Sequence, residues 1–242
     1  MIELSMLLMT GDRPQQVACC LTSLLGQAPG ATLYLVDNGE RSVLDNAMVR
    51  GILDLAQQLD DWRVVSCRQE RKPLLSAMQK EALSWLPAEG LFLWLEDDTV
   101  WGRDAIPRLV AGMQSYRAVS PVVVDVVNPG FPDFTGLERF SDPTAHVAPM
   151  HHLYTPSVAP FGLDLFCNVF MCRLQDAHGI EYPVVPVGQD MMFSKALPDP
   201  NGCIPSAEVY HLPHTRSDTQ KGWKAMDVPG LLRSGVIEWK MR

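Results

Sequence analysis

The segment that decides the fold reads Gly90-Leu-Phe-Leu-Trp-Leu-Glu-Asp-Asp-Thr-Val-Trp-Gly102. Five apolar residues, 91–95, run directly into three adjacent acids, Glu96, Asp97 and Asp98. An apolar run without alternation is typical of a strand that is buried on both faces, in the middle of a mostly parallel sheet. Neighbouring carboxylates repel one another unless a cation or a set of hydrogen-bond donors meets them. The segment therefore predicts a central strand that ends against something positively charged.

Short apolar runs alternate with amphipathic segments around this strand, a pattern typical of βα units. We expect strands at residues 3–9, 32–36, 63–67, 91–95 and 119–124, and helices at residues 14–25, 42–59, 73–86 and 104–116. Together they predict one α/β domain with a mostly parallel central sheet flanked by helices. At 242 residues the chain is long enough to bury a substantial core in such a domain.

The second half of the chain follows a different pattern. Residues 128–161 are rich in proline and predict a long irregular excursion, and such loops in compact domains are usually functional. A loop that leads into a short helix is expected within residues 187–197, and one more strand at residues 206–212.

Composition argues against several classes of function. Lys and Arg number 20 against 28 for Asp and Glu, so the net charge of -8 disfavours binding to nucleic acid or to an anionic membrane. Residues 1–10 carry Glu3 and lack a basic stretch, so they predict a strand and not a signal peptide. No apolar run approaches the roughly 20 residues of a membrane span, and we expect a cytoplasmic protein. The six cysteines lack CxxC spacing and predict free thiols.

Polar residues follow each of the first four predicted strands, at positions 10–14, 37–39, 68–72 and 96–98. Ligands of open α/β sheets bind at the carboxyl ends of the strands. Carboxylate oxygens suit Mg²⁺ or Mn²⁺, and such sites combine one or two carboxylates with the phosphates of a substrate. Residues 96–98 therefore predict a divalent cation, with a solvated acidic turn as the alternative. For residues 37–39 the alternative is a simple strand-to-helix turn.

The order of these motifs resembles a known family. The motifs are Thr10-Gly-Asp-Arg-Pro14 after the first strand, Ser23-Leu-Leu-Gly-Gln27 at the end of a helix, Val36-Asp-Asn-Gly39, a basic segment at 68–72, Leu95-Glu-Asp-Asp98 and Gly188-Gln-Asp190. In this order they resemble the inverting family 2 nucleotide-sugar glycosyltransferases, which have the GT-A fold and an Asp-x-Asp motif. The resemblance is strongest over residues 1–100, thinner over 161–212, and absent over 125–160.

The resemblance implies a role for each of these positions. Asp37 would contact uracil or another base, with Thr10 and Asp12 lining the same pocket. Asp98 would bind the metal, Mn²⁺ or Mg²⁺, and His211 would be a further ligand, with His214 as a second candidate. The full set of implied donor-binding residues is Thr10, Asp12, Arg13, Asp37, Asn38, Arg71, Lys72, Glu96 and Asp97.

Inversion at an anomeric carbon requires a base that removes the proton of the acceptor hydroxyl. By position and by resemblance this base is Asp190, although an Asp at the start of a helix is also a common N-cap residue. The family usually has Glu-Asp here, whereas this chain has Gln189-Asp190.

The same resemblance implies the partners and the division of the chain. The donor would be a nucleotide sugar, with UDP favoured and GDP or TDP as alternatives, and the acceptor is open among saccharides, lipid-linked groups, small molecules and modified nucleobases. Residues 1–125 would form the nucleotide-sugar-binding half and residues 126–212 the acceptor-binding half of one domain. Residues 213–242 would form a tail or a lid that carries Arg216 and Lys221.

Three other functions compete with this interpretation. A sugar nucleotidyltransferase shares the metal chemistry, but normally has a glycine-rich loop after its first strand, where this chain has Thr10-Gly-Asp-Arg-Pro14. A dinucleotide-dependent oxidoreductase requires GxGxxG in that turn, and the motif is absent. A module that binds a sugar nucleotide without turnover is the non-enzymatic alternative.

Overall fold

A computed structural model of the chain describes residues 3–70, 74–125, 160–163, 169–184 and 189–212, and the structural statements below concern these residues. The predictions for Arg71, Lys72 and His214, and for residues 126–159 and 213–242, lie outside them. None of the described helices has the length and apolar character needed to cross a membrane.

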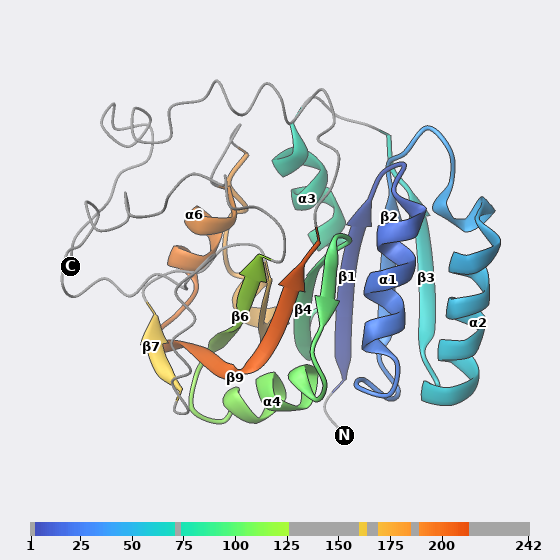
Figure 1. The fold of residues 1–242 in the computed structure, drawn as a ribbon. Helices are drawn as coiled ribbons and strands as arrows, with labels where there is room; N and C mark the ends of the chain where they lie inside the picture. Colours follow the sequence, from blue (N-terminus) through green and yellow to red (C-terminus); the bar gives the residue numbers. More distant parts are fainter. Residues whose placement is uncertain (1–2, 71–73, 126–159, 164–168, 185–188, 213–242) are drawn as a thin grey trace.

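The described strands form one sheet in the order β3-β2-β1-β4-β8-β6-β9-β5, and β7 pairs with β9 (Figure 1). Their bounds are β1 Leu4–Thr10, β2 Thr32–Asp37, β3 Arg63–Arg68, β4 Leu91–Glu96, β5 Thr99–Trp101, β6 Ala118–Asp125, β7 Phe161–Leu163, β8 Phe170–Arg173 and β9 Asn201–His211. The antiparallel pairings all involve β5, β7 or β8, so the other strands run in one direction. The predicted mostly parallel α/β sheet is confirmed.

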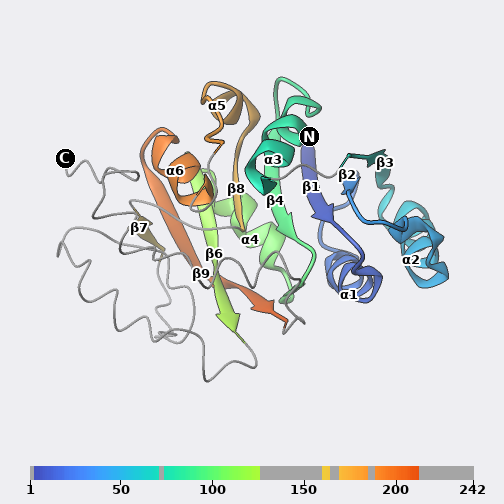
Figure 2. The same ribbon diagram turned by 90° about the horizontal axis from the view of Figure 1, so that it is seen from above.

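Helices cover both faces of the sheet (Figure 2). Helices α1 (Pro14–Leu24), α2 (Ala47–Asp60) and α4 (Ala105–Gly112) contribute to one hydrophobic core. Helices α3 (Leu75–Ser84), α5 (Leu174–His178) and α6 (Gln189–Ala196) contribute to the other. The sheet is therefore the middle layer of three.

Strand β4 supplies side chains to both cores, as its unbroken apolar run predicts. Leu91, Leu93 and Leu95 belong to the core beneath α1, whereas Phe92 and Trp94 belong to the core beneath α6. Because side chains alternate along a strand, Glu96 continues the face of Phe92 and Trp94. The first acid of the triplet thus leaves the sheet on the side of α6.

Two elements differ from their predictions. The helix expected over residues 42–59 is interrupted, because the side chain of Asn46 accepts the amides of Met48 and Val49 and starts α2 there, after a short 3-10 helix, η1 (Val43–Asp45). The strand expected over residues 206–212 is the last part of β9, which already begins at Asn201 and pairs with β6 along its length. The sequence predictions also lacked the short antiparallel strands β5, β7 and β8.

Strand register brings the predicted functional segments together. Thr10 lies beside Asp37, and Asp37 beside Arg68, at the ends of β1, β2 and β3. At the end of β4, the chain turns back into β5, which pairs with β9 so that Thr99 faces His211. The carboxyl ends of β1 to β4 and of β9 therefore border the same region.

Candidate functional site

Two members of the acidic triplet, Asp97 and Asp98, are buried against a cation supplied by the chain. Asp97 and Asp98 occupy the turn between β4 and β5, and Asp97 is only 1% exposed. The Thr10 hydroxyl donates to Asp97 Oδ2 at 2.6 Å, and the Arg13 Nη2 lies 2.6 Å from Asp97 Oδ1. The second nitrogen of the same guanidinium, Nη1, donates to Asp98 Oδ2 at 3.0 Å. The triplet is therefore not a solvated turn. Its sequence predicted a positively charged partner, and Arg13 is such a partner.

Three residues of the site can hold a metal ion. Glu96, Asp98 and His211 each offer one ligand atom, and these atoms lie within 4.8 Å of one another. His211 Nε2 lies 3.5 Å from Asp98 Oδ1, and the amide of Leu212 donates to the Asp98 carbonyl oxygen at 2.7 Å, which fixes the end of β9 beside the turn. Two carboxylates with one imidazole fit a divalent cation such as Mn²⁺, because carboxylates suit Mg²⁺ and Mn²⁺ while imidazole suits transition metals.

The electrostatics of Glu96 indicate a site that favours a cation. Burial raises the pKa of Glu96 well above its usual value, and the neighbouring carboxylates of Asp98, Asp190 and Asp97 raise it further. The Arg13 guanidinium acts in the opposite direction on this pKa. Four carboxylates thus share a region that Arg13 neutralises only in part. A divalent cation would relieve this repulsion and favour the ionised form of Glu96.

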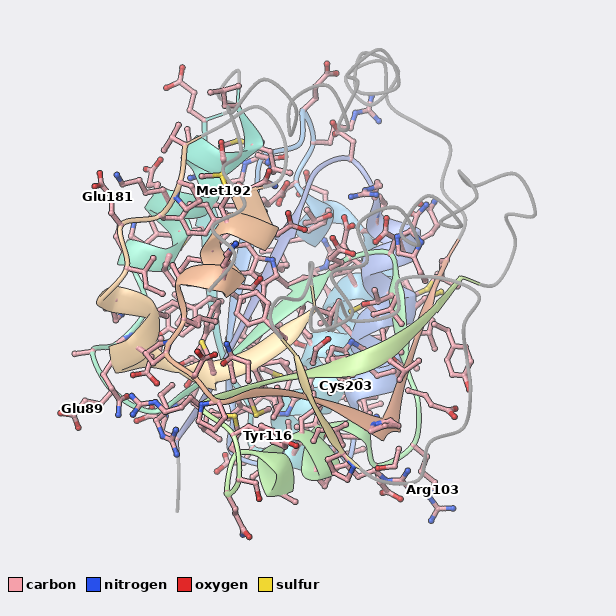
Figure 3. The ribbon with its side chains drawn as sticks, turned by 90° about the vertical axis from the view of Figure 1, so that its left-hand side faces the viewer. Glu89, Arg103, Tyr116, Glu181, Met192 and Cys203 are labelled. Atoms are coloured by element: carbon pink, nitrogen blue, oxygen red, sulfur yellow. The ribbon has the colours of Figure 1, made fainter. Side chains whose placement is uncertain are left out.

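Helix α6 brings Asp190 to the acidic triplet. Asp190 is the second residue of the helix and lies in its first turn, one residue after buried Gln189. Its charge raises the pKa of Glu96 and contributes, after burial, to the raised pKa of Tyr182. Figure 3 shows Met192 of the same helix toward the end of the molecule where the parallel strands finish, whereas Arg103 and Tyr116 lie toward the other end.

An aromatic cluster fixes the position of α6. The ring of Phe193 lies 5.1 Å from that of Tyr182, and the Tyr182 ring stacks on Trp94 at 5.9 Å, with an interplanar angle of 10°. The Tyr182 hydroxyl donates to Gln79 Oε1 on α3 at 3.0 Å. Such aromatic pairs add directional stability to a core. Trp94 is therefore a core residue, and it packs through Tyr182 against the helix that carries Asp190.

A second group of contacts surrounds Asp37 at the end of β2. The Asp37 carboxylate accepts the amide of Gly39 on Oδ1 and the amide of Val43 on Oδ2, each at 2.9 Å. Arg68 Nη1 donates to Asp37 Oδ2 at 2.7 Å, while its Nη2 donates to the Gly39 carbonyl at 2.6 Å. Asp37 is buried, whereas the Arg68 side chain is half exposed. Arg68 belongs to the basic segment at 68–72, and the register of β2 and β3 brings it beside Asp37.

Asp12 and Asn38 hold the loops after β1 and β2 close together. Asp12 has a left-handed φ of 58°, and its Oδ1 accepts the amide of Arg41 at 3.2 Å. A Cβ on Gly39 would lie 2.6 Å from the Asp12 amide nitrogen, and one on Gly11 would lie 2.3 Å from Asn38 Oδ1. The close approach of the two loops therefore requires glycine at position 39, where the neighbour is backbone, whereas a side chain at position 11 would displace the Asn38 amide.

A depression of about 630 Å³ is lined by residues of these loops and of the segments that follow them. None of the acidic triplet lines it, so it is not the centre of the predicted chemistry. Its lining residues are Asp12, Pro14, Gln15, Glu40, Arg41, Ser42 and Val43.

The described cysteines are free, as predicted, and most of them are buried. Burial raises the pKa of the Cys203 thiol to about 12, so this group stays protonated at neutral pH.

These strand ends and their helical layers define a sheet of the GT-A class, and comparison with solved structures supports this assignment. No family model and no curated protein matches the sequence. A structure of GalNAc-T7 with UDP, GalNAc and Mn²⁺ superposes with a TM-score of 0.63 at 12% identity, over 89% of this chain and 44% of that chain. A structure of S. aureus TarS 1–349 in complex with UDP-GlcNAc gives a TM-score of 0.62 at 13% identity, over 90% of this chain and 61% of that chain.

A longer structure of S. aureus TarS matches with a TM-score of 0.60 at 13% identity, over 88% of this chain and 37% of that chain. The chain thus spans less than two thirds of the length of these glycosyltransferase structures. At such low identities the likeness establishes the fold, and the chain has the GT-A fold.

Proposed function

We propose that the chain transfers a sugar from a nucleoside-diphosphate sugar to an acceptor hydroxyl, with the help of a divalent cation. The observation that carries this proposal is the approach of Glu96, Asp98 and His211 to within 4.8 Å of one another at the end of the central strand. The GT-A fold supports it, since solved structures of that fold include glycosyltransferases with UDP or UDP-GlcNAc bound.

The donor would bind across the ends of β1, β2 and β4. Asp37, the last residue of β2, would accept a hydrogen bond from the base, with Arg68 beside it. Uridine is the favoured nucleoside, because the neighbouring structures contain UDP, and GDP and TDP are the alternatives to test. Further donor-binding residues in this proposal are Thr10, Asp12, Arg13, Asn38, Asp97, Arg71 and Lys72.

Asp98, His211 and Glu96 would hold the cation. The resemblance alone assigned Glu96 to the donor, and its place beside Asp98 and His211 now favours a ligand role. Mn²⁺ fits this mixed carboxylate and imidazole set, and it is present in the GalNAc-T7 structure. Bound there, the ion would stabilise the negative charge that the leaving nucleoside diphosphate gathers.

Asp190 would act as the general base of an inverting transfer. Its carboxylate would take the proton of the acceptor hydroxyl as that oxygen forms its bond to the anomeric carbon. The bond from the anomeric carbon to the phosphate oxygen breaks in the same step, and its electrons leave with the nucleoside diphosphate. The effect of the Asp190 charge on the pKa of Glu96 supports this role, because it indicates a carboxylate close enough to interact with the proposed metal ligands.

The two halves of the domain would divide the substrates. Residues 1–125 would bind the nucleotide sugar and residues 126–212 the acceptor, since α6 and β9 carry Asp190 and His211 from the second half into the site. Residues 213–242, the tail or lid of this division, lie outside the described residues. The acceptor class is open among saccharides, lipid-linked groups, small molecules and modified nucleobases.

Release of nucleoside diphosphate from a panel of UDP-, GDP- and TDP-sugars tests the function. We expect release with at least one donor in Mn²⁺, little release in EDTA, and loss of release in Asp98→Asn. Sugar-nucleotide affinity without release under any condition would favour a binding module. The absence of affinity for every donor would overturn the proposal.

A further inference from the structure

The planar guanidinium of Arg13 contacts two members of the acidic triplet, Asp97 and Asp98. Its Nη2 lies 2.6 Å from Asp97 Oδ1, and its Nη1 lies 3.0 Å from Asp98 Oδ2. The other oxygen of Asp97 accepts the Thr10 hydroxyl at 2.6 Å, and the other oxygen of Asp98 lies 3.5 Å from His211 Nε2. Asp98 therefore stands between the guanidinium on one side and the candidate metal ligands on the other.

We propose that Arg13 and Asp97 are positioning residues for the metal site, and that neither contacts the ion. Arg13 holds Asp98 by Oδ2, while Oδ1 lies toward His211. Asp97 in turn holds Arg13, and Thr10 holds Asp97. This inference deepens the proposed function and rests on it, because it concerns the geometry of the same cation site.

The contacts of Asp97, the middle acid of the triplet, support its role as a positioning residue for the metal site. Asp97 is the most buried member of the triplet, and both of its oxygens carry short contacts to the β1–α1 segment. The group of potential metal ligands in the described residues comprises its two sequence neighbours, Glu96 and Asp98, and His211, but not Asp97. A carboxylate so engaged fixes the turn after β4 to the end of β1.

Removal of Arg13 should change the metal affinity in opposite directions, depending on whether Arg13 orients a metal ligand or acts only through its charge. If Arg13 acted only as a charge, its removal would relieve repulsion with a bound cation and tighten metal binding. If Arg13 orients a ligand, its removal should weaken metal binding about 10-fold or more, the usual effect of losing a group that orients a metal ligand. Lysine keeps the charge but lacks the planar fork that spans two carboxylates. Arg13→Lys and Arg13→Gln therefore separate the two roles.

The test is Mn²⁺ binding to the full chain without donor, measured from the electron paramagnetic resonance signal of free Mn²⁺. We expect Arg13→Lys, Arg13→Gln and Asp97→Asn each to raise the dissociation constant about 10-fold. Because the two residues act through one contact, the Arg13→Gln/Asp97→Asn double variant should bind no more weakly than Arg13→Gln alone. Arg63→Gln, which breaks an exposed ion pair with Glu3, is the matched control and should bind like the native chain.

Native affinity in Arg13→Lys together with tighter binding in Arg13→Gln would overturn the positioning role and leave the proposed function intact. Absence of Mn²⁺ binding by the native chain would overturn both. Circular dichroism checks each variant for folding. Since Arg13→Gln leaves buried Asp97 without its guanidinium, Arg13→Lys and the double variant decide the question if that single variant does not fold.

Discussion

Replacement of Asp37 by alanine should reduce both the stability of the fold and the affinity for nucleotide. The carboxylate accepts two buried backbone amides, those of Gly39 and Val43, and each buried donor left without an acceptor costs about 1–3 kcal/mol. The ion pair with Arg68 adds little, because that side chain is half exposed. The two amides together predict a loss of about 2–6 kcal/mol in the free energy of unfolding, with the lower half of that range expected where water enters the vacated space.

Urea unfolding followed by circular dichroism measures the stability, and calorimetric titration with UDP and Mn²⁺ measures the affinity. Asp60→Ala is the matched control, because Asp60 is also buried and its Oδ2 accepts the amide of Gly26 at 2.6 Å, just ahead of the start of β3. We expect Asp60→Ala to lose about 1–3 kcal/mol of stability and to keep native UDP affinity. Native stability in Asp37→Ala, or equal loss of UDP affinity in both variants, would refute the reasoning.

Three further predictions concern the acidic end of the site. Asp190→Asn should lower kcat by about 10²- to 10⁴-fold and leave the dissociation constant of the donor nearly unchanged, since a general base acts on the acceptor proton. Glu96→Gln should raise the Tm of the metal-free protein at neutral pH and abolish Mn²⁺ binding. Because the pKa of Glu96 is raised by burial and by its acidic neighbours, the native chain loses stability as pH rises through that pKa, and the Tm advantage of the variant should grow over the same range. His211→Gln should weaken Mn²⁺ binding about 10-fold or more without loss of fold.

Each of these predictions has an outcome that contradicts it. Full turnover in Asp190→Asn would remove that residue from the chemistry. A Tm difference between Glu96→Gln and the native chain that stays constant from pH 4 to 8 in EDTA would show that Glu96 does not titrate as its burial implies. Unchanged Mn²⁺ affinity in His211→Gln would leave the carboxylates as the metal ligands without the imidazole.

The parts of the fold that depend on local pattern were predicted from the sequence. The apolar run of β4 predicted a strand buried on both faces, and its side chains do enter both cores. The position of β5 was not predictable in the same way. Its three residues form a strand only because β9, from the far end of the chain, pairs with them. That pairing is also what brings His211 to Asp98.

The residue types of the site were predicted from the sequence, but the contacts between residues distant in the sequence were not. The acidic triplet predicted a positively charged partner but did not identify it as Arg13. The contact of Arg13 with Asp97 depends on β1 and β4 ending side by side. The raised pKa of Glu96 depends partly on Asp190, which only the packing of α6 against the aromatic cluster places nearby. Arg68 was left out of the implied donor-binding set, which took Arg71 and Lys72 from the same basic segment, since its contact with Asp37 requires the register of β2 and β3.

The acidic triplet has a physical reason to persist at the end of a buried strand. Arg13 partly neutralises Asp97 and Asp98, while Glu96 remains in a region where the ionised carboxylate is disfavoured. A protein that kept this arrangement without a cation would lose stability at neutral pH with no evident gain. Strain of this kind is typical of functional sites.

Calorimetric titration of the native chain with UDP, once in Mn²⁺ and once in EDTA, tests the central claim most directly. If a divalent ion between the acidic triplet and the donor's phosphates is what binds the nucleotide, UDP should bind in Mn²⁺ and at least about 100-fold more weakly in EDTA, equivalent to about 2.7 kcal/mol. Equal UDP affinity in both buffers would contradict the claim.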